Sequence, residues 1–146
     1  MLCPVCQKDM AVLEFNQIEM DFCLSCEGCW LDAGELGLVL TGTVDVPSDW
    51  RIEAGVRSRR RCPRCGGRMS AGPLPGTTVE VDVCDRQHGM WLDQGELRAV
   101  AEVRGRAGRT TALADFLGTL LQAKTRGFPG DSARRAGCEE KKGDQQ

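Results

Sequence analysis

The sequence lacks any long hydrophobic run, and this absence excludes a helix that crosses a membrane. Such a helix needs about 20 consecutive apolar residues, and polar or charged residues interrupt every apolar stretch of this 146-residue chain much earlier. The first residues, Met1-Leu2-Cys3-Pro4, contain neither the basic nor the apolar segment of a secretion signal. We therefore expect a cytoplasmic protein without a membrane partner, in which cysteine thiols stay reduced.

Positive charge is nearly absent from the N-terminal third of the chain. Residues 1–50 contain one basic residue, Lys8, and nine acidic residues, which gives a formal charge of −8. Residues 51–146 contain eighteen basic and twelve acidic residues, which gives +6. Because binding to phosphate groups depends on basic side chains, the N-terminal third is a poor candidate for a nucleic-acid contact. Any such contact would have to come from the later residues.

Histidine is equally scarce, since His88 is the only one, whereas cysteine occurs nine times. In a reducing compartment, paired Cys-x-x-Cys motifs are typical of metal sites. The first set has the spacing Cys-x2-Cys-x16-Cys-x2-Cys, within the range of a four-cysteine zinc ribbon. The candidate ligands of this first site are Cys3, Cys6, Cys23 and Cys26. A second register is also open, because Cys26 and Cys29 form another Cys-x-x-Cys pair.

An internal repeat decides between the two registers. The heptapeptide Trp30–Leu36 (WLDAGEL) returns as Trp91–Leu97 (WLDQGEL), and the residues before each heptapeptide also correspond. Aligned from the tryptophans, Cys29 corresponds to Met90, which is not a usual zinc ligand. Cys29 is therefore left out of the site, either as a small buried residue or as a redox-sensitive thiol.

The second copy supplies only three cysteines for its own site. The position of Cys26 is taken by Gln87, a poor zinc ligand, but His88 follows immediately. The longer histidine side chain can bring a ring nitrogen to the metal, so we predict that it completes the site. The predicted ligands of the second site are Cys62, Cys65, Cys84 and His88. Without His88 as a ligand, the site would be open to water.

We predict one zinc ion in each site and therefore two per chain. Four protein ligands leave no position for water or substrate, which is typical of structural zinc sites. Iron is the alternative metal, and a histidine ligand favours zinc over it. Disulfide bonds are the other alternative, and a reducing compartment argues against them.

The fold class that these patterns indicate is a small, metal-stabilised α+β protein. Each copy has about 40 residues, a size at which a core seldom suffices without metal or disulfide bonds. We expect each copy to be a zinc ribbon built of β-hairpin knuckles and followed by a short capped helix. The expected segments are zinc ribbon 1 with its trailing helix at 1–42, a linker with a basic run at 43–61, zinc ribbon 2 with its trailing helix at 62–105, an amphipathic helix at 110–126, and a disordered tail at 127–146.

Each heptapeptide predicts the start of a helix. Asp32 and Asp93 stand three residues before Glu35 and Glu96, the spacing of a capping box in which the aspartate is the N-cap. We expect the tryptophans to lie on the ribbon side and to shield the thiolates from water. Capping accounts for the carboxylates without any reaction, so we predict no catalytic residue.

Two segments are candidates for contact with a partner. The first is an apolar stripe at helical spacing, formed by Leu113, Phe116, Leu117, Leu120 and Leu121. It predicts a helix that packs on the rest of the chain, on a second copy of the chain as a homo-oligomer, or on a protein partner. The second is the run Arg57–Arg61, which is either a solvated linker or a contact for an acidic partner or nucleic acid. No aromatic residues interleave with these arginines, which weakens the nucleic-acid interpretation.

The motif Cys-Pro-x-Cys-x3-Met, followed by Glu-x-Asp-x-Cys and Gly-x-Trp-Leu-Asp-x-Gly-Glu-Leu, resembles the bacterial transcription-factor zinc-finger family. This family is named for its likeness to the zinc ribbon of transcription factor IIB. The resemblance covers roughly residues 2–41 and 61–102. It implies a zinc-ribbon fold with a trailing helix and metal binding through the knuckle cysteines. The second copy departs from the family pattern at Gln87-His88, which concerns its fourth ligand alone.

On these grounds we expect a non-enzymatic, zinc-binding protein that acts as a protein-interaction or transcription-associated adaptor. The alternative is a nucleic-acid-binding transcriptional regulator that uses the basic linker. A third interpretation is a thiol or redox-active zinc protein, which would require a second site that is short of a ligand.

Overall fold

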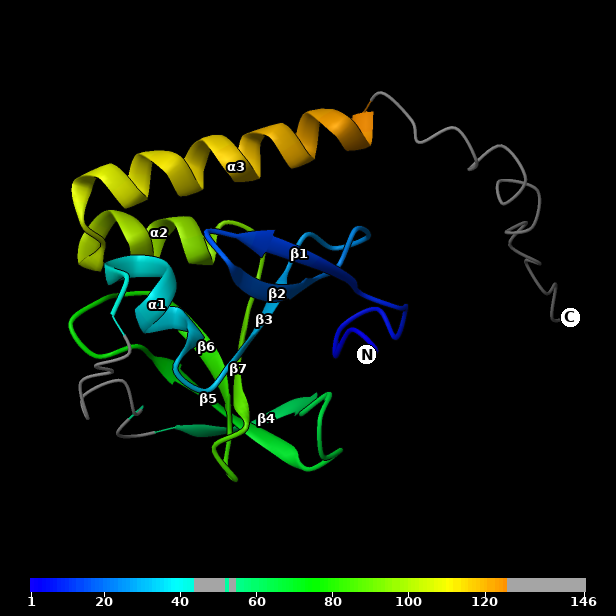
Figure 1. Ribbon diagram of the computed structural model, residues 1–146. Coiled ribbons are helices and arrows are strands. Elements are labelled where there is room, and N and C mark those ends of the chain that lie inside the picture. Colours follow the sequence, from blue (N-terminus) through cyan, green and yellow to red (C-terminus); the bar gives the residue numbers. More distant parts are fainter. Residues whose placement is uncertain (44–51, 53–54, 126–146) are drawn as a thin grey trace, which may run out of the picture.

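The computed structural model describes residues 1–43, 52 and 55–125, which form one antiparallel sheet and three helices (Figure 1). In chain order the elements are β1 (Ala11–Phe15), β2 (Ile18–Phe22), β3 (Cys29–Asp32), α1 (Glu35–Thr41), β4 (Val56–Arg61), β5 (Arg68–Pro73), β6 (Glu80–Cys84), β7 (Gly89–Leu92), α2 (Glu96–Arg104) and α3 (Ala107–Thr125). The strand order across the sheet is β1-β2-β3-β7-β6-β5-β4. This architecture agrees with the expected α+β class.

The two copies meet in the middle of the sheet, where β3 of the first copy pairs with β7 of the second. The pairing is antiparallel and sets Trp30 directly opposite Trp91, with Asp32 opposite Gly89. The copies, expected as two separate ribbons, are therefore halves of one sheet. A strand that follows a zinc knuckle has an unpaired edge in an isolated ribbon, and here the counterpart strand fills that edge.

The hairpin of the first copy turns at two residues with left-handed backbone. β1 and β2 pair in register up to Phe15 opposite Ile18, and the two residues between them are Asn16 and Gln17. Their φ angles are 50° and 65°, as a two-residue hairpin turn with left-handed backbone requires. The apolar and acidic alternation of β2 then points Met20 and Phe22 into the interior, where they are buried.

All three helices gather on one side of the molecule, and α3 runs across the others (Figure 1). Their apolar residues pack with residues from both halves of the sheet into one core, so the copies share a hydrophobic interior. In that core the ring of Phe116 on α3 lies 5.3 Å from the ring of Phe15 on β1. None of the helices within the described residues has the length and apolar character needed to span a bilayer.

The apolar stripe of α3 is used mainly within the chain. Leu113 is buried, and Phe116 and Leu117 pack against the shared core. Leu121 at the other end of the stripe is 38% exposed. The helix also begins three residues earlier than the expected start at residue 110, because Ala107 already lies in its first turn.

The basic run lies in a strand rather than in a linker, which corrects the prediction for residues 43–61. The arginines of 57–61 are part of β4, an edge strand that pairs with β5 through Val56 opposite Ala71 and Arg61 opposite Arg68. Ser58 occupies an inward position of this strand, since its side chain is buried. The other part of the expected linker, residues 44–51 and 53–54, and the expected tail at 127–146 lie outside the described residues.

The aspartates at the helix starts are not N-caps, contrary to the prediction. The N-caps of α1 and α2 are Gly34 and Gly95, which have φ angles of 91° and 82° and make no side-chain capping bond. Glycine suits this left-handed backbone because it has no Cβ. The glutamates still bond back to the aspartates, since Glu35 Oε2 accepts a hydrogen bond from the backbone N–H of Asp32 at 2.7 Å and Glu96 has the same role in the second copy.

Candidate metal centres

The first set of predicted ligands comes together in space. Cys3 and Cys23 are buried, Cys6 and Cys26 are partly exposed, and all four sulfur atoms lie within 4.8 Å of one another. The sulfur atoms of Cys3 and Cys26 are 3.6 Å apart. Tetrahedral zinc with Zn–S bonds of about 2.3 Å separates its sulfur ligands by roughly 3.8 Å. The donor set therefore fits a four-coordinate zinc ion.

Short backbone turns shape each knuckle around its cysteines. In the first knuckle the Cys3 N–H donates to the carbonyl of Lys8 at 2.8 Å, and the Gln7 N–H donates back to the carbonyl of Cys3 at 2.9 Å. The backbone N–H groups of Val5 and Cys6 then donate to Cys3 Sγ, both at 3.3 Å. Donors aimed at a sulfur atom favour its charged thiolate form, which is the form that binds zinc.

The second set of predicted ligands also comes together, with His88 included. Its four ligand atoms lie within 4.8 Å of one another. Cys65 Sγ is 3.8 Å from Cys84 Sγ, and His88 Nδ1 is 3.5 Å from Cys84 Sγ and 4.0 Å from Cys62 Sγ. Tetrahedral zinc would set its nitrogen and sulfur ligands roughly 3.5 Å apart. The site therefore fits zinc held by three thiolates and the Nδ1 atom of one imidazole.

The position of His88, one residue beyond the aligned cysteine, follows from a tighter turn. In the first copy the Glu27 N–H reaches back four residues to the carbonyl of Cys23 at 2.8 Å. In the second copy Gln87 reaches back only three residues to the carbonyl of Cys84, also at 2.8 Å. The left-handed residue of the turn is accordingly Glu27 in one copy and Gln87 in the other, with φ angles of 62° and 61°. The tighter turn brings the next residue, His88, to the metal.

The thiols of these sites need a cation in order to ionise together. Burial raises the pKa of Cys3, and burial likewise raises the pKa of Cys62 to about 11. A hydrogen bond from the backbone of Gly67, by contrast, lowers the pKa of Cys65 to about 7. Zinc binds thiolates, so binding releases protons from the thiols, and zinc affinity falls as the pH decreases. The eight described cysteines form no disulfide bonds.

Both tryptophans lie in a buried cluster that contains cysteines of the two sites. Trp30 and Trp91 are completely buried, so each indole N–H needs an acceptor. Trp30 Nε1 donates to Asp32 Oδ1 at 2.9 Å, and Trp91 Nε1 donates to Asp93 Oδ1 at 3.0 Å. The aspartates of the heptapeptides thus orient the indoles instead of capping the helices.

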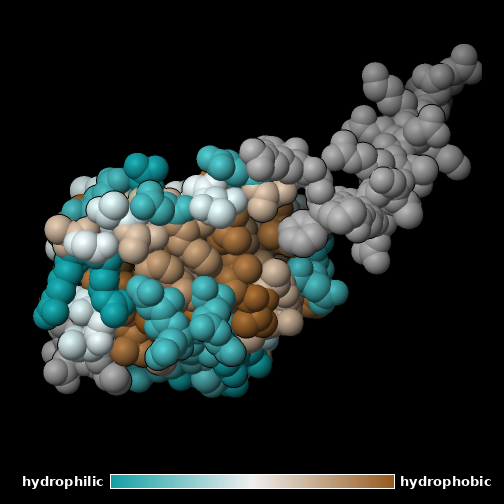
Figure 2. All heavy atoms as spheres, turned by 45° about the horizontal axis from the view of Figure 1, so that its top comes forward, coloured by the Kyte–Doolittle hydropathy of each residue, from teal (hydrophilic) through white to brown (hydrophobic). Residues whose placement is uncertain are grey.

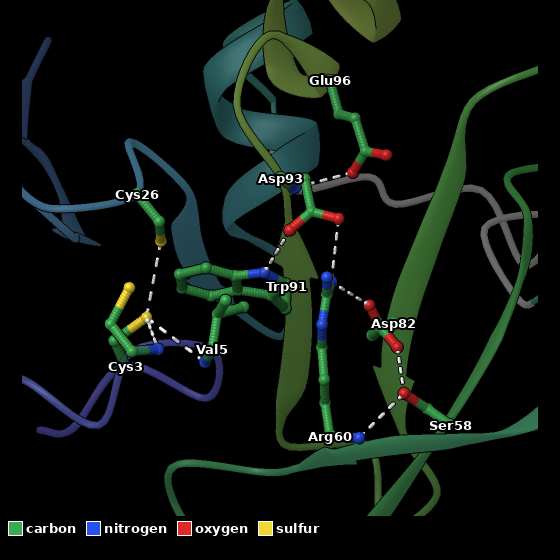
Figure 3. A network of polar contacts seen from close by, with 10 residues as sticks. Cys3, Val5, Cys26, Ser58, Arg60, Asp82, Trp91, Asp93 and Glu96 are labelled. Carbon is green, nitrogen blue, oxygen red and sulfur yellow. Dashed lines mark hydrogen bonds and ion pairs between the residues drawn. The ribbon is translucent and has the colours of Figure 1, made fainter. Parts of the chain in front are cut away.

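Each tryptophan packs against the zinc knuckle of the other copy. A Cβ atom on Gly28, in the first copy, would lie 2.3 Å from Cζ2 of Trp91. A Cβ atom on Gly89, in the second copy, would lie 2.8 Å from Cζ2 of Trp30. Figure 3 shows the Trp91 ring beside the sulfur atom of Cys26. The predicted shielding of the thiolates by tryptophan therefore crosses between the copies, and the glycines make room for it.

Arg60 on β4 and Arg64 in the second copy neutralise the aspartates of the two heptapeptides. Arg60 donates to Asp82 at 2.7 Å and to Asp93 at 2.9 Å (Figure 3). Arg64 lies in the first knuckle of the second copy and forms a two-pronged ion pair with Asp32 of the first. Burial alone would raise the pKa of Asp32, but this guanidinium lowers it. The Arg64 pair adds a polar link between the halves of the sheet.

Cys29 lies outside both ligand sets, as the repeat predicts. It is 4% exposed in β3 and packs in the shared hydrophobic core opposite Leu92. Burial raises the pKa of its thiol to about 12. A buried, protonated thiol is unreactive, so Cys29 acts as a small core residue.

Two roles in the site were not predicted. One is the aspartate that accepts the indole hydrogen bond, and its signal is the Trp-x-Asp spacing, which sets both side chains on one face of a strand. The other is the crossing of the tryptophans. That arrangement depends on the pairing of β3 with β7, which joins residues far apart in the sequence, and a local motif does not report it.

Replacing His88 with alanine is expected to make one of the two zinc ions easy to remove. Three thiolates would remain, so the second site would bind zinc more weakly, and a competing chelator should extract that ion at a concentration at least about tenfold lower than from the native chain. Released zinc can be followed with a colorimetric indicator. Because Nδ1 is the ring nitrogen nearer the backbone, a cysteine at this position has similar reach, and His88→Cys should restore resistance to the chelator. Equal chelator resistance of His88→Ala and the native chain would show that His88 is not a ligand.

Comparison with known proteins places these sites in a family. A comparison with curated proteins gives no match, and a comparison with solved structures gives none either. The family described as transcription factor zinc-finger matches residues 2–40 and 61–103. Each matched region contains one complete set of four ligands, and together the regions cover more than half of the chain. The chain therefore belongs to the transcription factor zinc-finger family and carries two tandem zinc ribbons with two zinc ions.

Proposed function

We propose that this chain is a non-enzymatic, zinc-stabilised protein that binds the phosphate backbone of nucleic acid with the hairpin β4–β5. The two zinc sites support the non-enzymatic part of the proposal. Each has four protein ligands, and a four-coordinate zinc ion without an open position activates no water. The zinc ions would hold the sheet together and leave the contacts to its surface.

The observation that carries the proposal is the set of exposed arginines on the edge strand β4. Arg57, Arg59 and Arg61 alternate along this strand and are all exposed. Among the described residues, the side chains of Arg57 and Arg59 have no hydrogen-bond or ion-pair partner, whereas Arg61 donates to a backbone carbonyl at 3.1 Å. Unpaired arginines that follow one strand match the spaced negative charges of a nucleic-acid backbone.

A second explanation for these arginines needs no ligand. Charged side chains on an edge strand discourage pairing with another chain, and β4 is an edge of the sheet. The two explanations differ in the dependence of binding on salt. Contacts to phosphate release bound counterions, so the logarithm of the binding constant falls linearly with the logarithm of the salt concentration.

Oligonucleotide binding at increasing salt tests the proposal. We expect fluorescence anisotropy to report binding of a mixed-sequence, single-stranded DNA at low salt, with a salt slope that becomes shallower by about one in Arg59→Ala. The matched control is Arg98→Ala, because Arg98 is an exposed arginine on α2, away from this hairpin, that pairs with Glu102. Absence of binding at low salt, or equal slopes for the two variants, would contradict the proposal.

A protein-interaction adaptor is the second candidate, and two features of the surface favour it. The variable positions of the zinc knuckles in the first copy carry Val5 and Leu24, which are 44% and 45% exposed. Hydrophobic residues also gather, bordered by hydrophilic ones, on the face that carries the helices (Figure 2). Exposed apolar side chains on a rigid knuckle suit a protein partner. Val5→Ser and Leu24→Ser would weaken the binding of such a partner without changing the salt dependence of DNA binding.

A further inference from the structure

A small cavity lies beside the second zinc site, on the surface of the hairpin β4–β5. Its volume is about 280 Å³, just below the range of about 300–1,000 Å³ for pockets that take drug-sized ligands. The residues that line it are Arg57, Cys65, Gly67, Arg68, Cys84, Asp85 and Arg86. Three of these seven residues are arginines, so the cavity suits a small anion better than an apolar molecule.

Three different elements supply the three arginines. Arg57 comes from β4, Arg68 begins β5, and Arg86 lies in the turn after β6. All three are exposed, and none of their side chains forms a hydrogen bond or ion pair with another described residue. Several like charges around one cavity repel one another unless an anion lies between them. The cluster therefore has donors and charge available for a ligand.

Negative charge near the cavity limits the kind of anion that fits. Asp85 lines the cavity, and its Oδ1 accepts a hydrogen bond from Ser70 Oγ at 2.6 Å. Three thiolates and a neutral imidazole around zinc also leave the neighbouring site with a net charge of −1. Three guanidinium groups exceed these two negative charges by one. A phosphate group suits this excess, because the planar fork of arginine matches its oxygen atoms and several arginines can donate to it together.

We propose that this cavity is a seat for one phosphate group, held by Arg57, Arg68 and Arg86. The phosphate is either a phosphodiester of a bound nucleic acid or a free inorganic phosphate. If the phosphate belongs to a nucleic acid, the inference rests on the proposed function. If it is free inorganic phosphate, the inference is independent of that function. In the first case the seat holds one phosphate of the nucleic acid beside the second zinc site, and the other arginines of β4 contact the phosphates that follow it.

Two probes distinguish the sources, and both use the full, zinc-loaded chain. The first probe is inorganic phosphate, which should raise the midpoint temperature of unfolding relative to chloride at equal ionic strength. Arg86→Ala should raise the half-saturating phosphate concentration about tenfold, since a charge-assisted hydrogen bond contributes about 1.5 kcal/mol or more. Zinc content measured in parallel shows that the variant is still folded around both metals.

The second probe is the mixed-sequence, single-stranded DNA, whose binding is again measured at increasing salt concentrations. Arg68→Ala and Arg86→Ala should each make the salt slope shallower by about one, and Arg98→Ala should leave it unchanged. Asp85→Asn keeps an acceptor for Ser70 but removes a negative charge, so it should tighten the binding of both probes. A gain of binding is useful here because a damaged fold does not produce it.

The outcomes separate the seat from the proposed function. If phosphate raises the midpoint temperature of unfolding in a way that depends on Arg86, and no DNA binds, the result supports the seat and contradicts the proposed nucleic-acid function. Binding of DNA that is insensitive to Arg68→Ala, Arg86→Ala and Asp85→Asn supports that function and overturns the seat. If phosphate does not raise the midpoint temperature and no DNA binds, both the seat and the proposed function are overturned.

Discussion

Replacing Gly89 with alanine is expected to destabilise the zinc-loaded chain by about 3 kcal/mol or more. The new Cβ would lie 2.2 Å from the carbonyl oxygen of Leu31 and 3.0 Å from Cα of Asp32. Both are backbone atoms of β3, so no rotation of a side chain can relieve the contact. The strand pair that joins the two copies would have to move apart, and the cost is that of a severely overpacked core.

Urea unfolding followed by tryptophan fluorescence measures this change as a lower midpoint. The matched control is Gly118→Ala in α3, where an added Cβ meets nothing within 4 Å. Alanine in the middle of a helix is more favourable than glycine, so this control should gain about 0.5–1 kcal/mol. A midpoint for Gly89→Ala equal to that of the native chain would mean that β3 and β7 are not paired in this register in solution.

Loss of a single zinc ligand from the first copy is expected to unfold both copies. Structural zinc contributes on the order of 10–16 kcal/mol to folding, which is as large as the whole stability of an ordinary domain. We expect Cys6→Ser to lose the first zinc ion in the presence of a mild chelator. Because the halves share one sheet and one core, the second half should then lose its protection as well.

Hydrogen exchange of the backbone amides of β6 and β7 measures the protection of the second half, whereas the substitution is made in the first half. Cys29→Ala is the matched control, because Cys29 is a buried cysteine that binds no metal. It should keep both zinc ions and lose no more than about 1–2 kcal/mol as a small change of volume in the core. Native protection of β6 and β7 in zinc-depleted Cys6→Ser would show that the halves fold independently.

The metal sites could be predicted from the sequence because their chemistry is local. Four ligands in two short turns need fixed spacings, and the repeated heptapeptide set the register that excludes Cys29 and points to His88. The tighter turn at Gln87 explains why the histidine stands one position later. The eight residues predicted as ligands lie together in two groups of four in the structure.

The parts that could not be predicted depend on contacts between distant segments. Asp32 has the spacing of an N-cap, but a glycine with left-handed backbone takes that role and the carboxylate turns to the indole of Trp30. The run Arg57–Arg61 reads as a linker because its charges hide any strand pattern, and only pairing with β5 makes it a strand. Local sequence indicates the structure that a segment favours by itself. These two segments take their structure from contacts with residues that are distant in the sequence.

The pairing of β3 with β7 has a consequence for how the chain depends on its own concentration. The equivalent residues Trp30 and Trp91 face each other there, and Cys29 opposite Leu92 mirrors Leu31 opposite Met90. The two copies therefore meet as two identical subunits of a symmetric dimer would. A chain with one copy would leave this edge and its tryptophan exposed until it met a second molecule. Covalent linkage makes that meeting intramolecular, at an effective concentration in the millimolar range. The duplicated chain can therefore pair these strands and bury both tryptophans however dilute it is.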